Sequence, residues 1–164
     1  MIGVLALQGD FAAHTKAFGA VEVRLAEEID RCDTLILPGG ESTTMLKLME
    51  GSRIEEAIQS LVKRGGKILG TCAGAILLAK EVLPAGQRSL GLIDVTIERN
   101  SYGRQVESFD TPLGPFIRAP RITRVGEGVE VLKEWEGDPV LLRQGNITVA
   151  TYHPELAAEP SLMI

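Results

Sequence analysis

The sequence predicts an α/β protein with three layers, in which an open, mostly parallel sheet carries helices on both faces. Over the first two thirds of the chain, short apolar runs that end at turn residues alternate with helical patterns. Their order, strand then helix then strand then helix, is typical of parallel strands joined by crossover helices. The 164 residues, 45% of them hydrophobic, suit one compact domain spanning residues 1–164.

The first part of the chain contains three strand candidates and one short helix. Residues 2–7 are an apolar run typical of a buried strand, and a helix is expected over residues 11–18. Residues 21–25 look extended. Residues 33–37 form a second apolar run, which turn residues end, and such a run fits a strand buried on both faces.

The clearest helical pattern follows Gly51. We expect Ser52 and Glu55 to form a capping box at its start, and two glycines at residues 65–66 to end it. A strand over residues 67–70 and a helix over residues 73–83 should follow. The apolar side chains of the first of these helices fall on one face, at Ile54, Ala57, Ile58, Leu61 and Val62.

After Pro84, short extended segments separated by turn signals dominate the chain. We expect mixed or antiparallel strands that continue the sheet. The segments are residues 92–98, 105–109, 116–118, 129–135, 140–144 and 147–151.

Composition excludes several classes of function. Lys and Arg total 17 against 22 Asp and Glu, a net charge of −5, and aromatic residues make up 4%. Neither value favours a nucleic-acid partner. No apolar run reaches the roughly 18 residues of a membrane span, so we expect no membrane partner and a cytoplasmic location. Cys32 and Cys72 are expected to be free thiols, and two histidines predict no metal site. No cofactor is expected.

The segment Gly70-Thr-Cys72-Ala-Gly74 lies where a strand should turn into a helix. A nucleophile between two glycines at such a turn projects from the carboxyl end of the sheet, where α/β proteins bind ligands. The start of the helix would favour a thiolate, and the N–H of Ala73 would face a developing oxyanion. On this motif alone, an inert buried cysteine in a glycine-rich turn remains an alternative.

A thiol nucleophile needs a base, and the chain has two histidines. His14 is expected on a surface helix, whereas His153 follows the last strand candidate. In Tyr152-His153-Pro-Glu155 the carboxylate can orient one imidazole nitrogen while the other faces the thiol. A solvated histidine in a C-terminal turn is the alternative interpretation.

A second glycine turn, Pro38-Gly-Gly-Glu-Ser-Thr-Thr44, also follows a strand candidate. The bare glycines allow backbone N–H groups to approach an anion or oxyanion, and Ser42 or Thr43 is expected to cap the next helix. A plain strand-to-helix turn explains the segment equally well. The spacing is not that of a P-loop.

These segments together resemble class I glutamine amidotransferases, through Gly70-Thr-Cys-Ala-Gly74, Pro38-Gly-Gly-Glu-Ser42 and His153-Pro-Glu155. Three others are similar to the glutaminase subunits of pyridoxal 5′-phosphate synthase: Leu5-Ala-Leu-Gln-Gly-Asp10, Glu98-Arg-Asn-Ser-Tyr-Gly-Arg-Gln105 and Phe116-Ile-Arg-Ala-Pro120. The similarity runs in order through nearly the whole chain. Two stretches differ from the family pattern: residues 19–32 are shorter than usual, and the sequence stops soon after His153-Pro-Glu-Leu156.

The resemblance implies hydrolysis of L-glutamine to L-glutamate and ammonia, with ammonia passed to a pyridoxal 5′-phosphate synthase subunit. It implies Cys72 as nucleophile, His153 as general base and acid, and Glu155 as the orienting carboxylate. Gln8 is implied near the active site and the partner surface. The oxyanion hole is implied at Gly40 and Ala73, and the glutamine pocket at Gly40, Glu41, Ser42, Arg99, Ile117 and Arg118.

Two other functions remain open at this point. One is the glutaminase subunit of another pathway, such as histidine biosynthesis, against which residues 99–105 and 116–120 count. The other is a non-catalytic regulatory subunit of the same fold with an inert thiol.

Overall fold

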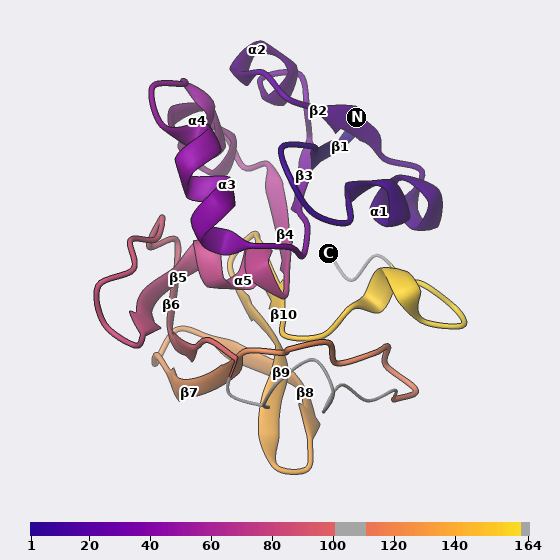
Figure 1. Ribbon diagram of the computed structural model, residues 1–164, viewed down its shortest axis with the longest axis vertical. Helices are drawn as coiled ribbons and strands as arrows, with labels where there is room; N and C mark the ends of the chain where they lie inside the picture. The colour runs from indigo at the N-terminus through magenta and orange to yellow at the C-terminus, as the bar shows by residue number, and fades with distance from the viewer. Residues whose placement is uncertain (101–110, 162–164) are drawn as a thin grey trace.

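The computed structural model describes residues 1–100 and 111–161, and the expected strand over residues 105–109 lies outside them. A central sheet of seven strands runs through the molecule (Figure 1). Along the sheet the strands are β2 (Val21–Val23), β1 (Ile2–Leu5), β3 (Thr34–Leu37), β4 (Lys67–Thr71), β10 (Ile147–Ala150), β9 (Asp138–Gln144) and β8 (Glu130–Trp135).

The first five strands in this order are parallel, and the last two are antiparallel to their neighbours. The predicted open and mostly parallel sheet is therefore confirmed. Strands β4 and β10 lie side by side at its centre, with Ala150 opposite Thr71 at their carboxyl ends. This pairing brings the segments that follow Thr71 and Ala150 together, although they are far apart in the sequence.

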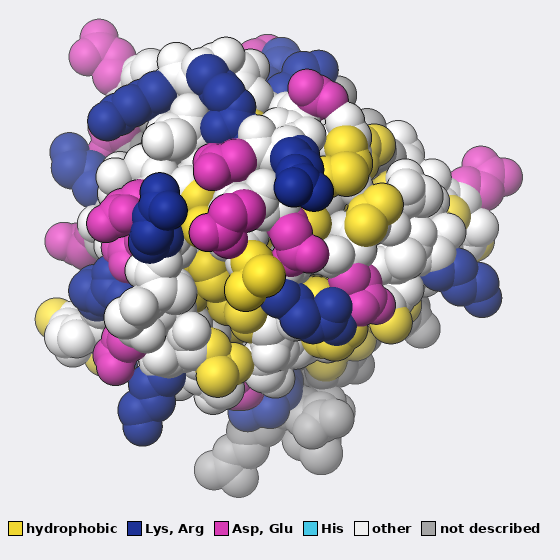
Figure 2. Space-filling model, turned by 90° about the horizontal axis from the view of Figure 1, so that it is seen from above, with side chains coloured by type: hydrophobic (Ala, Val, Ile, Leu, Met, Phe, Trp, Pro, Cys, Tyr) yellow, Lys and Arg dark blue, Asp and Glu magenta, His cyan; other side chains and the backbone are white. Residues whose placement is uncertain are grey.

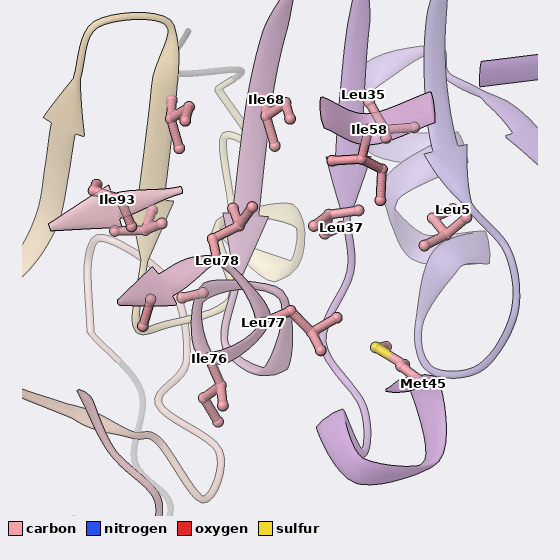
Figure 3. Close-up of a cluster of buried hydrophobic side chains, with 14 of the residues drawn as sticks. Leu5, Leu35, Leu37, Met45, Ile58, Ile68, Ile76, Leu77, Leu78 and Ile93 are labelled. Atoms are coloured by element: carbon pink, nitrogen blue, oxygen red, sulfur yellow. The ribbon is translucent and has the colours of Figure 1, made fainter. Parts of the chain in front are cut away.

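Helices cover both faces of the sheet, as predicted (Figure 1). The side chains of β3 alternate between the faces, because Leu35 and Leu37 join one apolar cluster while Ile36 joins another with Phe11 and Phe18. Figure 3 shows Leu35 and Leu37 within the larger cluster. The first face carries α2 (Ala26–Ile29), α3 (Ser42–Met49), α4 (Ile54–Lys63) and α5 (Ala73–Leu78), and the second carries α1 (Phe11–Phe18).

The second half of the chain does not simply continue the main sheet, and this corrects one expectation. The strands β5 (Ala79–Leu83), β6 (Ile93–Glu98) and β7 (Arg121–Val125) form a separate three-stranded sheet. The helix expected over residues 73–83 therefore ends at Leu78. Residues 79–83 are apolar enough for either structure, and parallel pairing with β6 is the tertiary interaction that makes them a strand.

Three local expectations are also wrong. Arg53, not Ser52, precedes α4, and Glu55 pairs with Arg88 at 2.6 Å instead of completing a capping box. Glu41 precedes α3, so neither Ser42 nor Thr43 caps it. Residues 116–118 form no strand beyond an isolated bridge at Phe116, because Arg118 has φ 47°, in the left-handed region that a strand cannot contain.

Within the described part of the chain, no helix has the length and apolar character needed to cross a membrane. On the face seen in Figure 2, basic and acidic side chains are interspersed around a few hydrophobic ones.

Candidate active site

The residues around Cys72 form the sharp turn between β4 and α5 that the sequence predicts. Cys72 has φ 50° and ψ −105°, a backbone conformation that L-residues rarely adopt. Close packing requires a glycine two residues later, since a Cβ on Gly74 would lie 1.9 Å from the carbonyl oxygen of Leu37. The Cys72 N–H donates to the Ala150 carbonyl at 2.8 Å, which ties the turn to β10. The thiol is therefore held at the carboxyl end of the parallel strands.

His153 and Glu155 lie on the segment that follows β10. His153 precedes the 3₁₀ turn η2 (Pro154–Leu156), and its backbone N–H donates to the Pro115 carbonyl at 2.9 Å. Its Nδ1 lies 2.6 Å from Oε1 of Glu155, and both side chains are buried. Because Nδ1 faces a carboxylate, it carries a proton, which leaves Nε2 as the atom that exchanges protons with other groups.

A second carboxylate, which we did not single out from the sequence, faces the same imidazole. Asp10 precedes α1, and its Oδ2 lies 3.3 Å from Nδ1 of His153. Donor atoms of Asp10, His153 and Glu155 lie within 4.8 Å of one another. One histidine nitrogen and two carboxylates can in principle coordinate a metal cation. Here, however, Nδ1 of His153 is already hydrogen-bonded to Glu155 and is not free to coordinate a metal.

Burial and mutual contact separate the pKa values of these three groups. Burial alone would lower the pKa of His153, but contacts with Asp10, Cys72 and Glu155 raise it to about 12. Burial raises the pKa of Glu155 to about 7, against the opposing effect of His153. Burial would also raise the pKa of Asp10, but contacts with His153 and Glu155 hold it at about 2. At neutral pH, Asp10 is therefore the more firmly ionised carboxyl group beside His153.

His14 is not the surface residue that the sequence predicts. Its side chain is fully buried, with Nε2 3.0 Å from Oγ1 of Thr71 and 3.4 Å from Oε2 of Glu155. Its Nδ1 lies 3.2 Å from the Asp10 carbonyl oxygen. Burial lowers the pKa of His14 despite the nearby Asp10 carboxylate. The prediction failed because contact between α1 and the η2 segment is a tertiary feature that helix periodicity does not reveal.

The glycine turn after β3 is braced by the loop after β1. Gly40 has φ 149°, and a Cβ there would lie 2.4 Å from Oε1 of Gln8. That oxygen accepts the Glu41 N–H at 2.8 Å, while the Asp10 N–H donates to the Gly39 carbonyl at 3.1 Å. Gln8 and Asp10 therefore determine where the backbone of the turn lies.

A cavity of about 360 Å³ brings the predicted site residues together. At its exposed rim, Nη1 of Arg118 lies 3.7 Å from Oε1 of Glu41. Deeper, buried Ser42 accepts a hydrogen bond from Nε2 of Gln87 at 2.9 Å. Glu155 does not line the cavity and lies behind His153. The predicted residues that line it are Gln8, Gly40, Glu41, Ser42, Cys72, Ala73, Arg99, Ile117, Arg118 and His153.

Gly39, the other bare glycine of the predicted turn, also lines this cavity, together with four residues that we did not predict there: Asp10, Ile76, Asn100 and Leu156. Asp10, Gly39 and Asn100 lie inside motifs that carried the resemblance, so their position was a usable signal. Nothing in the sequence marked Ile76 and Leu156 as site residues, because an apolar residue in a helix or turn is ordinarily part of the core.

Comparison with known proteins shows to which family the chain belongs. Residues 4–163 match the SNO glutamine amidotransferase family. The chain belongs to this family. It is 45% identical to "Pyridoxal 5'-phosphate synthase subunit PdxT" of Thermosipho africanus, over 96% of this chain and 92% of the relative. It is 47% identical to the protein of the same name from Thermus thermophilus, over 99% and 93%.

The fold of this SNO family member also matches solved structures. A crystal structure of a glutamine amidotransferase superposes with a TM-score of 0.89 and 46% identity, covering 97% of this chain and 93% of that one. PurLQS from Thermotoga maritima superposes with a TM-score of 0.64 at 22% identity, over 94% and 86%, and shows a shared fold alone.

Proposed function

We propose that this chain is a glutaminase that hydrolyses L-glutamine to L-glutamate and ammonia, with Cys72, His153 and Glu155 as its catalytic triad. The observation that carries the proposal is the buried 2.6 Å contact between Nδ1 of His153 and Oε1 of Glu155, beside a cavity that Cys72 also lines. A thiol, an imidazole and an orienting carboxylate are the groups that acyl transfer through a covalent intermediate requires.

Before the attack, the Cys72 proton lies on Nε2 of His153, because the neighbouring groups favour the imidazolium. In the first half of the reaction, the Cys72 thiolate attacks the side-chain amide carbon of glutamine. The tetrahedral intermediate collapses as the C–N bond breaks, and His153 returns the proton to the leaving nitrogen to form ammonia. Water then attacks the thioester with His153 as base, which releases glutamate and restores the thiol. Glu155 keeps the imidazole oriented through both halves.

The backbone beside Cys72 supplies the oxyanion hole in this proposal. The N–H groups of Gly40 and Ala73 stabilise the negative charge that develops on the amide oxygen. The strained turn at Cys72 presents the thiol to this position, and the braced glycine turn keeps its N–H groups in place. Such preorganisation lowers the cost of reorienting dipoles during the reaction.

The rest of the cavity suits the zwitterionic end of glutamine. Arg99 and Arg118 offer guanidinium groups for the α-carboxylate, and Glu41 at the rim offers a carboxylate for the α-ammonium group. Ser42, which Gln87 orients, and the backbone near Ile117 complete the wall. The cavity volume is adequate for one amino acid.

The ammonia is used by a synthase subunit that makes pyridoxal 5′-phosphate, as the names of the relatives at 45% and 47% identity suggest. The measurement is glutamate and ammonia release by the chain alone and with such a synthase subunit, compared with Cys72→Ala. Hydrolysis that Cys72→Ala abolishes supports the proposal. A chain inactive in both settings would support the non-catalytic alternative, and stimulation only by a histidine-pathway synthase would reassign the partner.

A further inference from the structure

We propose that Asp10 is a positioning residue of this site, a second carboxylate that holds His153 together with Glu155, so that each partly replaces the other. The proposal rests on the proposed function, because it concerns how the triad histidine is oriented. Its basis is geometric: the imidazole Nδ1 lies 2.6 Å from Oε1 of Glu155 and 3.3 Å from Oδ2 of Asp10.

The two carboxylates approach His153 from different parts of the fold. Glu155 lies two residues along the same segment, whereas Asp10 belongs to the loop that joins β1 to α1. Both oxygens of Asp10 are buried, and neither has an aligned hydrogen bond, because the Nδ1 proton points to the closer oxygen of Glu155. Asp10 is therefore positioned to accept this proton as soon as Glu155 is neutral or absent.

Close packing leaves Asp10 little freedom to move away from His153. A Cβ built on Gly39 would lie 2.5 Å from Cε1 of His153 and 3.3 Å from Oδ1 of Asp10. The Asp10 N–H is also anchored to the Gly39 carbonyl at 3.1 Å. The same residue thus contacts the general base through its side chain and the glycine turn through its backbone.

The charges of the two carboxyl groups also support a role for Asp10 beside His153. The groups that face this cluster are Asp10 and His14 from the first loop and helix, Cys72 from the turn before α5, and Glu155. Burial raises the pKa of Glu155 to about 7, while contacts with His153 and Glu155 hold that of Asp10 at about 2 against burial. As the pH falls below 7, Glu155 takes up a proton and Asp10 remains the anion beside the imidazolium.

The first test is a double-mutant cycle on kcat/KM for glutamine, with Asp10→Asn, Glu155→Gln and the double variant. If the carboxylates replace each other, the double variant should lose about 10-fold or more beyond the product of the two single losses. A loss equal to that product, or no greater than that of Glu155→Gln alone, would overturn the proposal. Asp30→Asn, an exposed aspartate at the end of α2, combined with Glu155→Gln is the matched control and should show no coupling.

The second test does not depend on glutamine hydrolysis. The rate at which iodoacetamide alkylates Cys72 is measured against pH by mass spectrometry, with buried Cys32 as internal reference. Removing the Asp10 charge should make the His153 imidazolium beside Cys72 less stable, because Asp10 is one of the groups that raise its pKa. Alkylation of Cys72 at neutral pH should therefore slow in Asp10→Asn relative to that of Cys32, and its rise with pH should move to higher pH. An unchanged profile would refute the placement of Asp10 on the base. If no glutaminase activity is found, this second measurement alone decides the proposal.

Discussion

The two cysteines of this chain are both buried free thiols, yet the groups that surround them differ. Cys72 lies in a strained turn at the carboxyl end of the sheet, lines the cavity and interacts with His153. Cys32 follows α2, where its thiol donates to the Glu28 carbonyl and burial raises its pKa.

A glycine leaves room for a close neighbour in both regions, but the neighbour differs. Near Cys32, a Cβ on Gly3 would lie 2.6 Å from the sulfur, so the glycine makes room for a thiol that fills space in the core. Near Cys72, Gly74 lets α5 pack closely on β3 while the thiol projects into a cavity. Burial by itself therefore does not distinguish a reactive cysteine from a structural one, and the groups that the sulfur faces do.

The largest expected effect separates these two thiols directly. Cys72→Ala should reduce glutamine hydrolysis by about 10⁴-fold or more, because the reaction loses its nucleophile. Cys32→Ala should retain activity within about twofold and lose only about 1 kcal/mol of unfolding free energy, the cost of a small cavity. Glutamate release measures the activity of each variant, and denaturant unfolding measures its unfolding free energy. Equal losses of activity in both variants would show that Cys72 is structural.

The two histidines extend the comparison. His153→Asn should lower kcat by about 10²–10⁴-fold, because it removes general acid–base catalysis. The measurement is steady-state kinetics with a check that the variant remains folded.

His14→Asn is the companion variant, and the structure changes what we expect from it. A surface histidine would be neutral, but His14 is buried against Thr71 and Glu155. We expect its loss to cost about 1–3 kcal/mol of unfolding free energy, as for a buried polar group left unpaired, with a smaller fall in kcat than His153→Asn. A larger fall in kcat for His14→Asn would mean that the base is misassigned.

Substitution of a residue in the glutamine pocket should change the kinetics less than substitution of Cys72 or His153. Arg99→Ala should raise KM for glutamine about 10-fold and change kcat little, because it removes a charged hydrogen bond made equally before and during the reaction. Arg88→Ala is the control, since Arg88 forms an ion pair with Glu55 and lines a second groove beside the glutamine pocket. An unchanged KM in Arg99→Ala would remove Arg99 from the glutamine pocket.

The smallest expected effect is on stability in acid. The folded-state pKa of Asp10 is about 2, below its ordinary 3.8, so the folded protein binds fewer protons than the unfolded chain in this range. The stability that Asp10 provides is present above about pH 4 and is lost as the pH falls towards 2, by roughly 1–2 kcal/mol. Urea unfolding of wild type and Asp10→Asn between pH 2 and 5 measures it. Parallel curves for the two proteins would contradict the lowered pKa.

Local patterns predicted much of this molecule correctly. The stripe from Ile54 to Leu61 is buried as expected, and the helix over residues 11–18 has the expected bounds. The strand–turn–helix around Cys72 also follows from sequence, because glycines that follow an apolar run and precede a helical pattern favour a tight turn. These features depend on interactions between residues close in the chain.

The failures share one cause, which is contact between segments far apart in the chain. Residues 79–83 are a strand because β6 pairs with them, and His14 is buried because η2 packs against α1. Asp10 was visible as a residue in a motif, but its 3.3 Å approach to His153 depends on the pairing of β4 with β10 and on the path of the loop after β1.

By itself, the sequence predicted the type of chemistry that we propose: the residues of a thiol–imidazole–carboxylate site, the turns that present them and the parallel sheet that aligns them. Only the tertiary structure decided how many charged groups surround the His153 imidazole. Hydrophobic periodicity shows which face of a helix or strand is buried, but it does not show which polar group lies opposite that face. Asp10 and Glu155 contact His153, and His14 contacts Glu155, because the segments that follow β1 and β10 lie at the same edge of the sheet.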